Sequence, residues 1–171
     1  MKGTRDTGVV LRRSTSTPLI EIYSDADFAG LADSHSVGGF IFLYAGCVIA
    51  WLSKRQTRIA LFTTESESMA LIPGAKHALW LRHFLQELGL PCAEPIHLYC
   101  DNVQTISNLH DVSHHLRTKH FRVEGHWVPE LVDHGEVEIT YVQSAENTAD
   151  VLTKALLLAQ HRFLIHKLGM L

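Results

Sequence analysis

Residues 19–27 constrain the fold of this chain more than any other stretch. They read L-I-E-I-Y-S-D-A-D, an apolar run rich in β-forming residues that ends in two acidic residues, Asp25 and Asp27. This pattern is typical of a buried central strand that stops at a carboxylate. Binding sites of α/β proteins form at the carboxyl ends of such strands. A functional site at this edge would need further carboxylates from elsewhere in the chain.

Length, charge and cysteine content exclude several classes of protein. The 171 residues, 46% of them hydrophobic, suit one domain with a full core. No apolar run approaches the ~20 residues of a membrane span, and the N-terminus lacks a signal-peptide pattern, so we expect a soluble intracellular protein without membrane contact. Three cysteines without a C-x-x-C pair argue against a disulfide framework. The net charge of −3 argues against a strongly basic nucleic-acid module, but not against a nuclease whose carboxylates bind cations.

The rest of the chain predicts an α/β fold, a mixed five-stranded sheet flanked by helices, with the first three strands antiparallel. Expected strands cover residues 19–24, 40–44, 47–52, 95–100 and 137–141. Expected helices cover residues 64–88, 102–109, 119–133, 145–157 and 158–168, with Ser144 as the N-cap of the fourth. Pro73 and Gly74 lie inside the first helix, where a proline costs roughly 3 kcal/mol, so we expect a kink or two helical pieces.

Four acidic residues stand where this fold could gather them at one edge of the sheet. Asp25 ends the first strand and Asp101 follows the fourth, so they meet only if these strands are parallel neighbours. Glu67 lies in the first turn of the long helix, and Asp150 lies early in the helix after the fifth strand. Mg²⁺ prefers oxygen ligands, and two such ions ~3.5–4 Å apart stabilise the attacking and leaving oxygens of phosphodiester hydrolysis. The four residues therefore predict a two-metal site.

Each of these residues alone also has a simpler interpretation. Thr64 and Glu67 have the spacing of a capping box. Asp101 could cap the helix that follows it, and Asp150 could stabilise a helix N-terminus. Taken together, and with the order β-β-β-α-β-α-α-β-α, the four acidic residues favour the metal site.

Six segments occur in a fixed order along the chain, at residues 23–30, 51–56, 63–71, 99–102, 117–120 and 148–154. Together they resemble the ribonuclease H domain of copia-type retrotransposon Pol polyproteins, over essentially the whole chain. The resemblance implies a ribonuclease H-like fold and cleavage of the RNA strand of RNA–DNA hybrids during reverse transcription. It also implies a two-Mg²⁺ site, in which Mn²⁺ could substitute, with Asp25 and Asp101 on both ions and Glu67 and Asp150 on one each. Glu67 is preferred to Glu65 because Glu67-Ser-Met-Ala70 resembles the Glu-x-x-Ala helix start of ribonucleases H.

The resemblance also implies partners and domain boundaries. Residues 1–18 resemble the end of an upstream reverse transcriptase and a linker, residues 19–157 form the ribonuclease H-like domain, and residues 158–171 form a helical tail. We expect the reverse transcriptase as a partner in the intact polyprotein, within a cytoplasmic virus-like particle. Contacts to the hybrid are expected from polar side chains towards 2′-hydroxyls and from basic side chains towards phosphates. The polar candidates are Ser34, Ser36, Asn102 and Gln104, and the basic ones are Lys54, Arg55, Arg117 and Lys119.

Some features depart from the family pattern and leave a second hypothesis open. Residues 144–147 contain no histidine, although cellular ribonucleases H carry one shortly before their last aspartate. Pro73, Gly125 and Pro129 fall inside expected helices. The alternative is therefore a catalytically decayed remnant, or a domain that only binds nucleic acid or packs against the polymerase. Four histidines also invite a zinc interpretation, but no cysteine pair follows them, so we interpret them as surface residues; they are His114, His115, His120 and His126.

Overall fold

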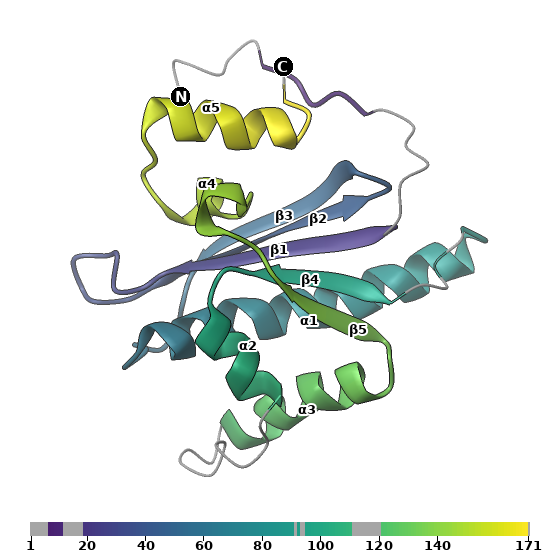
Figure 1. Ribbon diagram of the computed structural model, residues 1–171, viewed down its shortest axis with the longest axis horizontal. Coiled ribbons are helices and arrows are strands. Elements are labelled where there is room, and N and C mark those ends of the chain that lie inside the picture. Colours follow the sequence, from purple (N-terminus) through teal and green to yellow (C-terminus); the bar gives the residue numbers. More distant parts are fainter. Residues whose placement is uncertain (1–6, 12–18, 91, 93–94, 111–120, 171) are drawn as a thin grey trace.

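The computed structural model describes residues 7–11, 19–90, 92, 95–110 and 121–170, and it confirms the predicted sheet (Figure 1). Its strands are β1 (Ile20–Asp27), β2 (Val37–Tyr44), β3 (Cys47–Arg55), β4 (Ile96–Cys100) and β5 (Val137–Tyr141), in the spatial order β3-β2-β1-β4-β5. The helices are α1 (Thr63–Glu87), α2 (Val103–His110), α3 (Phe121–Asp133), α4 (Asp150–Thr153) and α5 (Leu158–Lys167). Among the described residues, no helix is both long and apolar enough to cross a bilayer.

The central strand β1 has a different neighbour on each side. It pairs antiparallel with β2 and parallel with β4, and β4 pairs parallel with β5. The parallel pairing of β1 and β4 is the condition that the predicted meeting of Asp25 and Asp101 required. β1 also runs three residues beyond its predicted end, because Asp25 and Ala26 still pair with Gly39 and Gly38 of β2. Asp25 therefore lies inside the strand rather than after it.

Both faces of the sheet are covered, as Figure 1 shows, with α1, α2 and α3 on one side and α4 and α5 on the other. Side chains alternate between the two faces along β2. Phe40 and Phe42 join the large core under α1, whereas Ile41 and Leu43 join a smaller cluster with Leu168, beyond the end of α5. This double burial explains why β2 reads as a continuous apolar run rather than as an alternating one.

Of the two outcomes expected at Pro73, a kink or two helical pieces, the division into two pieces is wrong. Residues from Thr63 to Glu87 form one helix, although Pro73 lies inside it. Leu71 and Ala75 on either side of the proline are fully buried. Burying one large apolar side chain contributes about 1.5–3 kcal/mol, so packing against the sheet offsets the cost of the missing hydrogen bond.

The predicted helix at residues 145–157 is also wrong. Residues Ser144–Glu146 form a single 3-10 turn, and α4 spans only Asp150–Thr153, so Ser144 is not an N-cap. The cause is Asn147, which is fully buried and has an extended backbone. Its side chain donates to the carbonyl of Ser24 at 2.9 Å and accepts from the N–H of Ala149 at 3.2 Å. These bonds compete with helix formation and tie the segment before α4 to β1.

Candidate metal centre

Three aspartates from three parts of the chain meet at the edge of the sheet. Asp25 of β1 is fully buried, Asp101 follows β4 directly, and Asp150 begins α4. One carboxylate oxygen from each of these residues lies within 4.8 Å of the other two. The structure thus brings together three of the four residues that the sequence predicted to lie together.

The fourth residue, Glu67, joins the same cluster through Asp101. A carboxylate oxygen of Glu67, one of Asp101 and Sγ of Cys100 form a second group within 4.8 Å. Glu67 is only 4% exposed, and its Oε2 has no hydrogen-bond partner among the described residues. We call Asp25, Glu67, Asp101 and Asp150 the carboxylate cluster.

Glu65, the alternative to Glu67, has a different role. Its Oε2 accepts the backbone N–H of Leu61 at 2.8 Å, just before the start of α1. α1 begins at Thr63 with Phe62 at its N-cap, so Thr64 is not the N-cap and the alternative interpretation as a capping box is wrong. The geometry therefore favours Glu67 over Glu65 as a member of the site.

The electrostatics of the cluster favour a bound cation. Burial and the neighbouring charges of Asp25 and Asp101 raise the pKa of Glu67 to about 9. Burial and the charge of Asp25 also raise the pKa of Asp150 to about 6, against the opposing effect of Lys154. Carboxylates this close repel one another unless a proton or a cation lies between them.

The chemistry of the donor atoms selects the kind of cation. Burial raises the pKa of the Cys100 thiol to about 12, so the sulfur stays protonated and is a poor ligand. The remaining donors are carboxylate oxygens, including the unpaired Oε2 of Glu67. Among the described residues, neither group that could hold a metal contains a histidine. An all-oxygen set suits Mg²⁺ or Mn²⁺ and does not suit zinc.

The sequence interpretation missed Lys154, which lies in the cluster itself. Its Nζ donates to Oδ1 of Asp25 at 2.8 Å and to Oδ1 of Asp150 at 3.1 Å. Burial alone would lower the pKa of Lys154, but the two carboxylates raise it above the ordinary value, so the side chain is a cation. Thr153 donates its hydroxyl to the other oxygen of Asp25. The spacing of Asp150 and Lys154, four residues apart on a helix, was the signal available in the sequence.

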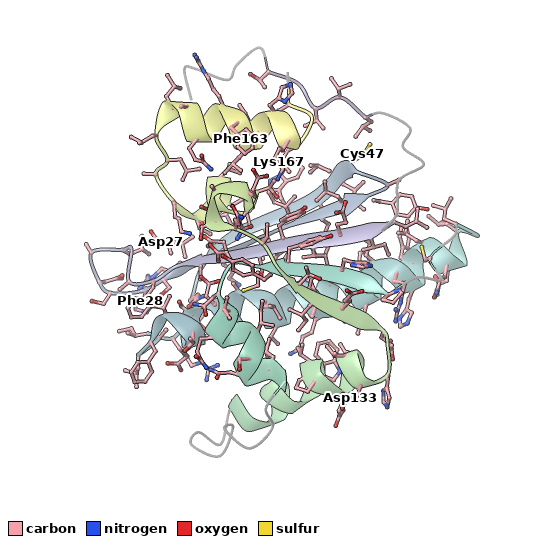
Figure 2. The ribbon with its side chains drawn as sticks, in the orientation of Figure 1. Asp27, Phe28, Cys47, Asp133, Phe163 and Lys167 are labelled. Atoms are coloured by element: carbon pink, nitrogen blue, oxygen red, sulfur yellow. The ribbon has the colours of Figure 1, made fainter. Side chains whose placement is uncertain are left out.

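Asp27, the second acidic residue of the first strand, is outside the cluster. Figure 2 shows Asp27 and Phe28 where β1 runs into the loop at residues 28–36. A Cβ atom at Gly30 would lie 1.9 Å from Oδ2 of Asp27, so the carboxylate occupies space that only glycine leaves free. Asp27 therefore shapes this turn, and neither group of possible metal ligands among the described residues includes it.

The predicted hybrid contacts near this loop differ in accessibility. Ser34 and Lys54 are exposed, and Arg55 is exposed but pairs with Oδ2 of Asp33 at 2.5 Å. The prediction for Ser36 needs correction, because Ser36 is fully buried and its hydroxyl accepts the N–H of Ala29 at 3.1 Å. Its side chain holds the loop in place and is not presented to a ligand.

The other predicted contacts lie at α2 or outside the described residues. Oδ1 of Asn102 accepts the N–H of Thr105 at 2.9 Å, which caps the start of α2. Gln104 is exposed and donates to Oδ1 of Asn108 at 2.8 Å. The structure does not describe Arg117, Lys119, His114, His115 or His120, or the side chain of His126.

Comparison with solved structures identifies the fold of this protein. LC11-RNase H1, solved in complex with an RNA/DNA hybrid, superimposes with a TM-score of 0.57 over 78% of this chain and 93% of that one, at 13% identity. The chain therefore has the ribonuclease H fold that its motifs predicted. No family model matches it.

Sequence comparison identifies the relatives more closely. The chain is 41% identical over 155 residues to the retrovirus-related Pol polyprotein from transposon TNT 1-94 of Nicotiana tabacum, covering 90% of this chain and 11% of the relative. It is 30% identical over 172 aligned positions to that of transposon RE2 of Arabidopsis thaliana, covering 100% of this chain and 12% of the relative. The chain thus spans about a tenth of the length of the relatives it matches. It is a homologue of the ribonuclease H domain of copia-type retrotransposon Pol polyproteins.

Proposed function

We propose that this chain is a metal-dependent endoribonuclease that hydrolyses the RNA strand of RNA–DNA hybrids during retrotransposon reverse transcription. The observation that carries the proposal is the unpaired, buried Oε2 of Glu67 within a cluster of four carboxylates. A buried carboxylate without a partner costs several kcal/mol unless it is protonated or bound to a cation. A cation site satisfies this group and places it beside the other acidic side chains.

We assign the four carboxylates as ligands of two Mg²⁺ ions, for which Mn²⁺ could substitute. Asp101 belongs to both groups of donors, so we assign it to both ions. We also assign Asp25 to both ions, as the resemblance to ribonucleases H implies. Glu67 and Asp150 each belong to one group and hold one ion each. When bound, the ions supply positive charge for the phosphate oxygens and lower the pKa of water.

We assign Lys154 a positioning role next to the ligands. Its ammonium group holds the side chains of Asp25 and Asp150 together and neutralises part of their charge. It therefore competes with a metal ion for the same two carboxylates and tunes the metal affinity of the site. Thr153 supports this role, since its hydroxyl fixes the orientation of Asp25.

The substrate is proposed from the relatives and from the exposed residues around the site. LC11-RNase H1 binds an RNA/DNA hybrid, and it shares the fold of this chain. Ser34, Lys54 and Gln104 are exposed and stay candidates, Lys54 for phosphate contacts and the other two for 2′-hydroxyl contacts. Arg117 and Lys119 stay predictions, as do the upstream reverse transcriptase as a partner and the virus-like particle as a location.

The alternative, a decayed or purely binding domain, rested on helix-breaking residues and on the absence of a histidine at residues 144–147. α1 runs through Pro73 as one helix, and all four carboxylates are present and gathered. We therefore favour the enzyme.

The test is cleavage of an RNA–DNA hybrid, labelled on the RNA strand, by the full 171-residue chain. We expect RNA fragments with 5′-phosphates in Mg²⁺ or Mn²⁺ and none in excess chelator. A DNA duplex of the same sequence should stay intact. Binding of the hybrid without cleavage in either metal would refute the enzyme and support the binding domain.

A further inference from the structure

A second site lies on the sheet face that α1 covers. Leu52 and Lys54 are alternate residues at the end of β3, and Gln56 follows the strand directly. The side chains of Leu52 and Lys54 project from the same face as Phe40 of β2, and all four residues line one cavity. With α1 they enclose a cavity of about 250 Å³, which we call the α1 cavity. Ligand sites for drug-sized molecules usually measure about 300–1,000 Å³, so this cavity has room for roughly one ring system.

The helix contributes an unusual acceptor to this cavity. Met69, Pro73 and His77 are spaced four residues apart and form one stripe of α1 that lines it. Proline has no N–H, so the carbonyl of Met69, four residues earlier, cannot receive its ordinary helix hydrogen bond. The same proline therefore leaves the carbonyl of Met69, a residue that lines the cavity, without its ordinary helix donor.

A second acceptor comes from Gln56, which is 7% exposed. Its Nε2 donates to the carbonyl of Ser66 at 2.8 Å, which fixes the orientation of the amide. Its Oε1 is buried and has no partner among the described residues. Buried amide oxygens are almost always paired, so this one calls for a donor that the protein does not supply.

The mouth of the cavity carries a positive charge. The side chain of Lys54 is exposed, and its ammonium group has no ion pair or side-chain hydrogen bond among the described residues. Arg55 also lines the cavity, but its guanidinium is held by Asp33 and by Nδ1 of His35. Lys54 is therefore the cation available to an anionic ligand.

The cavity also depends on a glycine. A Cβ atom at Gly38 would lie 3.2 Å from Cβ of Ala70 and 3.2 Å from Nε2 of Gln56. Both contacts are tighter than ordinary packing allows, so a side chain here would press α1 and Gln56 away from the sheet. Phe40, which is 4% exposed, forms an aromatic wall beside this position.

We propose that the α1 cavity binds a nucleoside phosphate. The base packs against Phe40 and Leu52, and its N–H groups donate to the Met69 carbonyl and to Oε1 of Gln56. The phosphate is held by Lys54 at the mouth. A flat ring with N–H donors and an attached anion matches two free acceptors, an apolar wall and one cation. The proposal goes beyond hybrid cleavage and does not depend on it.

The register of the sheet places this site beside the carboxylate cluster. Ala26, which follows Asp25, pairs with Gly38, and Gly38 pairs with Lys54. Two strand spacings of about 4.8 Å put Lys54 roughly 10 Å from β1 across the sheet. The nucleoside phosphate could be one unit of a nucleic-acid strand or a free nucleotide, and the two sources are separable by experiment.

The first measurement is a titration of the ¹⁵N-labelled full chain with AMP, followed by NMR. We expect saturable shifts of amides in residues 38–40, 54–57 and 70–77. Lys54→Gln should weaken AMP binding at least fivefold, whereas Arg58→Gln, which removes the same charge from an exposed residue outside the cavity, should change it less than twofold. Equal effects of the two substitutions, or inorganic phosphate binding as tightly as AMP, would overturn the proposal.

The second measurement uses Pro73→Ala, which returns an N–H to the Met69 carbonyl. We expect AMP binding at least threefold weaker although the protein becomes more stable, a combination that loss of structure would not produce. Unchanged AMP affinity would overturn the assignment.

A titration with a single-stranded pentanucleotide separates the two sources of the ligand. If the pentanucleotide shifts the same amides and competes with AMP, the ligand is a unit of a nucleic-acid strand; if AMP alone causes shifts, the ligand is a free nucleotide. No shift with either would refute the site.

Discussion

The carboxylate cluster and the α1 cavity lie at neighbouring strands of one sheet, yet they differ in charge and in how they are held. The cluster is acidic, and its carboxylates come from β1, α1, α4 and the end of β4. The cavity is lined by apolar and basic side chains, and its acceptors are neutral. Each contains a buried side-chain oxygen that finds no partner in the described part of the chain, Oε2 of Glu67 in one and Oε1 of Gln56 in the other. An unpaired acceptor beside acidic groups indicates a cation, whereas one beside an apolar wall indicates an N–H donor.

The largest effect on cleavage should follow substitution of Asp101, the carboxylate that belongs to both groups of metal donors. Asp101→Asn should lower hybrid cleavage roughly a hundredfold or more, because it weakens both proposed ions. Hybrid binding should be unchanged or tighter, since one negative charge near the phosphates is lost. The matched control is Asp133→Asn, at the exposed end of α3, which Figure 2 shows away from the cluster. Loss of binding together with cleavage, measured by gel shift and product analysis, would mean that the substitution unfolds the domain.

The next effect is on the pH dependence of the free energy of unfolding, measured without divalent cations. Burial and its acidic neighbours raise the pKa of Glu67 from 4.5 to about 9, so folding favours its protonated form. This stabilisation is complete below pH 4.5 and is lost as pH rises towards 9. Glu67→Gln should therefore raise the free energy of unfolding by about 1–3 kcal/mol at pH 8 in chelator, and by little at pH 4.

Urea melts at the two pH values measure this difference, and Mg²⁺ provides the control. Metal should raise the melting temperature of the unmodified protein, because binding to the folded state alone is stabilising, and should raise that of Glu67→Gln less, because the variant lacks a ligand of one of the two proposed ions. A pH-independent effect of the substitution would mean that Glu67 is not protonated in the metal-free cluster.

A substitution of Lys154 tests how its positive charge affects the metal affinity and the stability of the carboxylate cluster. Lys154→Met removes the ammonium that competes for Asp25 and Asp150, so the apparent Mg²⁺ affinity should rise about three- to tenfold. Stability in chelator should fall by about 1–2 kcal/mol, since two buried carboxylates lose their counter-ion. Calorimetric Mg²⁺ titration and urea melts check the two effects, with Lys167→Met, on the exposed pair with Glu146, as the control. Weaker metal binding would mean that Lys154 chiefly orients the ligands.

The smallest effect concerns α1. Replacing Pro73 and Gly74 with alanine should raise the free energy of unfolding by a little more than about 1 kcal/mol, because it restores a hydrogen bond and reduces unfolded-state entropy. A Cβ at Gly74 meets Phe40 at 3.7 Å, an ordinary contact, so the core accepts it. Cleavage should hold, and denaturant midpoints decide the stability. An unchanged or lower midpoint would indicate that α1 requires its proline.

The order of the strands and helices was predictable because it depends on local patterns. Alternation and turn residues located the strands, and the end of β4 at Asp101 was visible in the sequence. The same patterns located Asp25 and Glu67. The resemblance to ribonucleases H already favoured Glu67 over Glu65, and the structure agrees, because Glu65 bonds to the N–H of Leu61 while Glu67 lies in the cluster.

What the sequence did not predict depends on contacts between distant residues. The extension of β1 to Asp27 comes from pairing with Gly38 and Gly39 of β2. The failure of the helix after Ser144 comes from the bond of Asn147 to Ser24, 123 residues away in the chain. The burial of Ser36 likewise depends on the course of its loop, for which no periodic pattern exists.

The position of Asp25 inside β1 has a consequence for how the protein loses function. Its backbone is paired with Gly39, and the flanking residues of β1 are paired as well, so this carboxylate cannot be released by fraying of a strand end. Local openings of a folded protein start in loops and termini, whereas central strands open only with the whole molecule. Amide hydrogens around Asp25 should therefore exchange with solvent only through global unfolding. Under denaturant, we therefore expect Asp25 to leave the site only when the sheet itself unfolds.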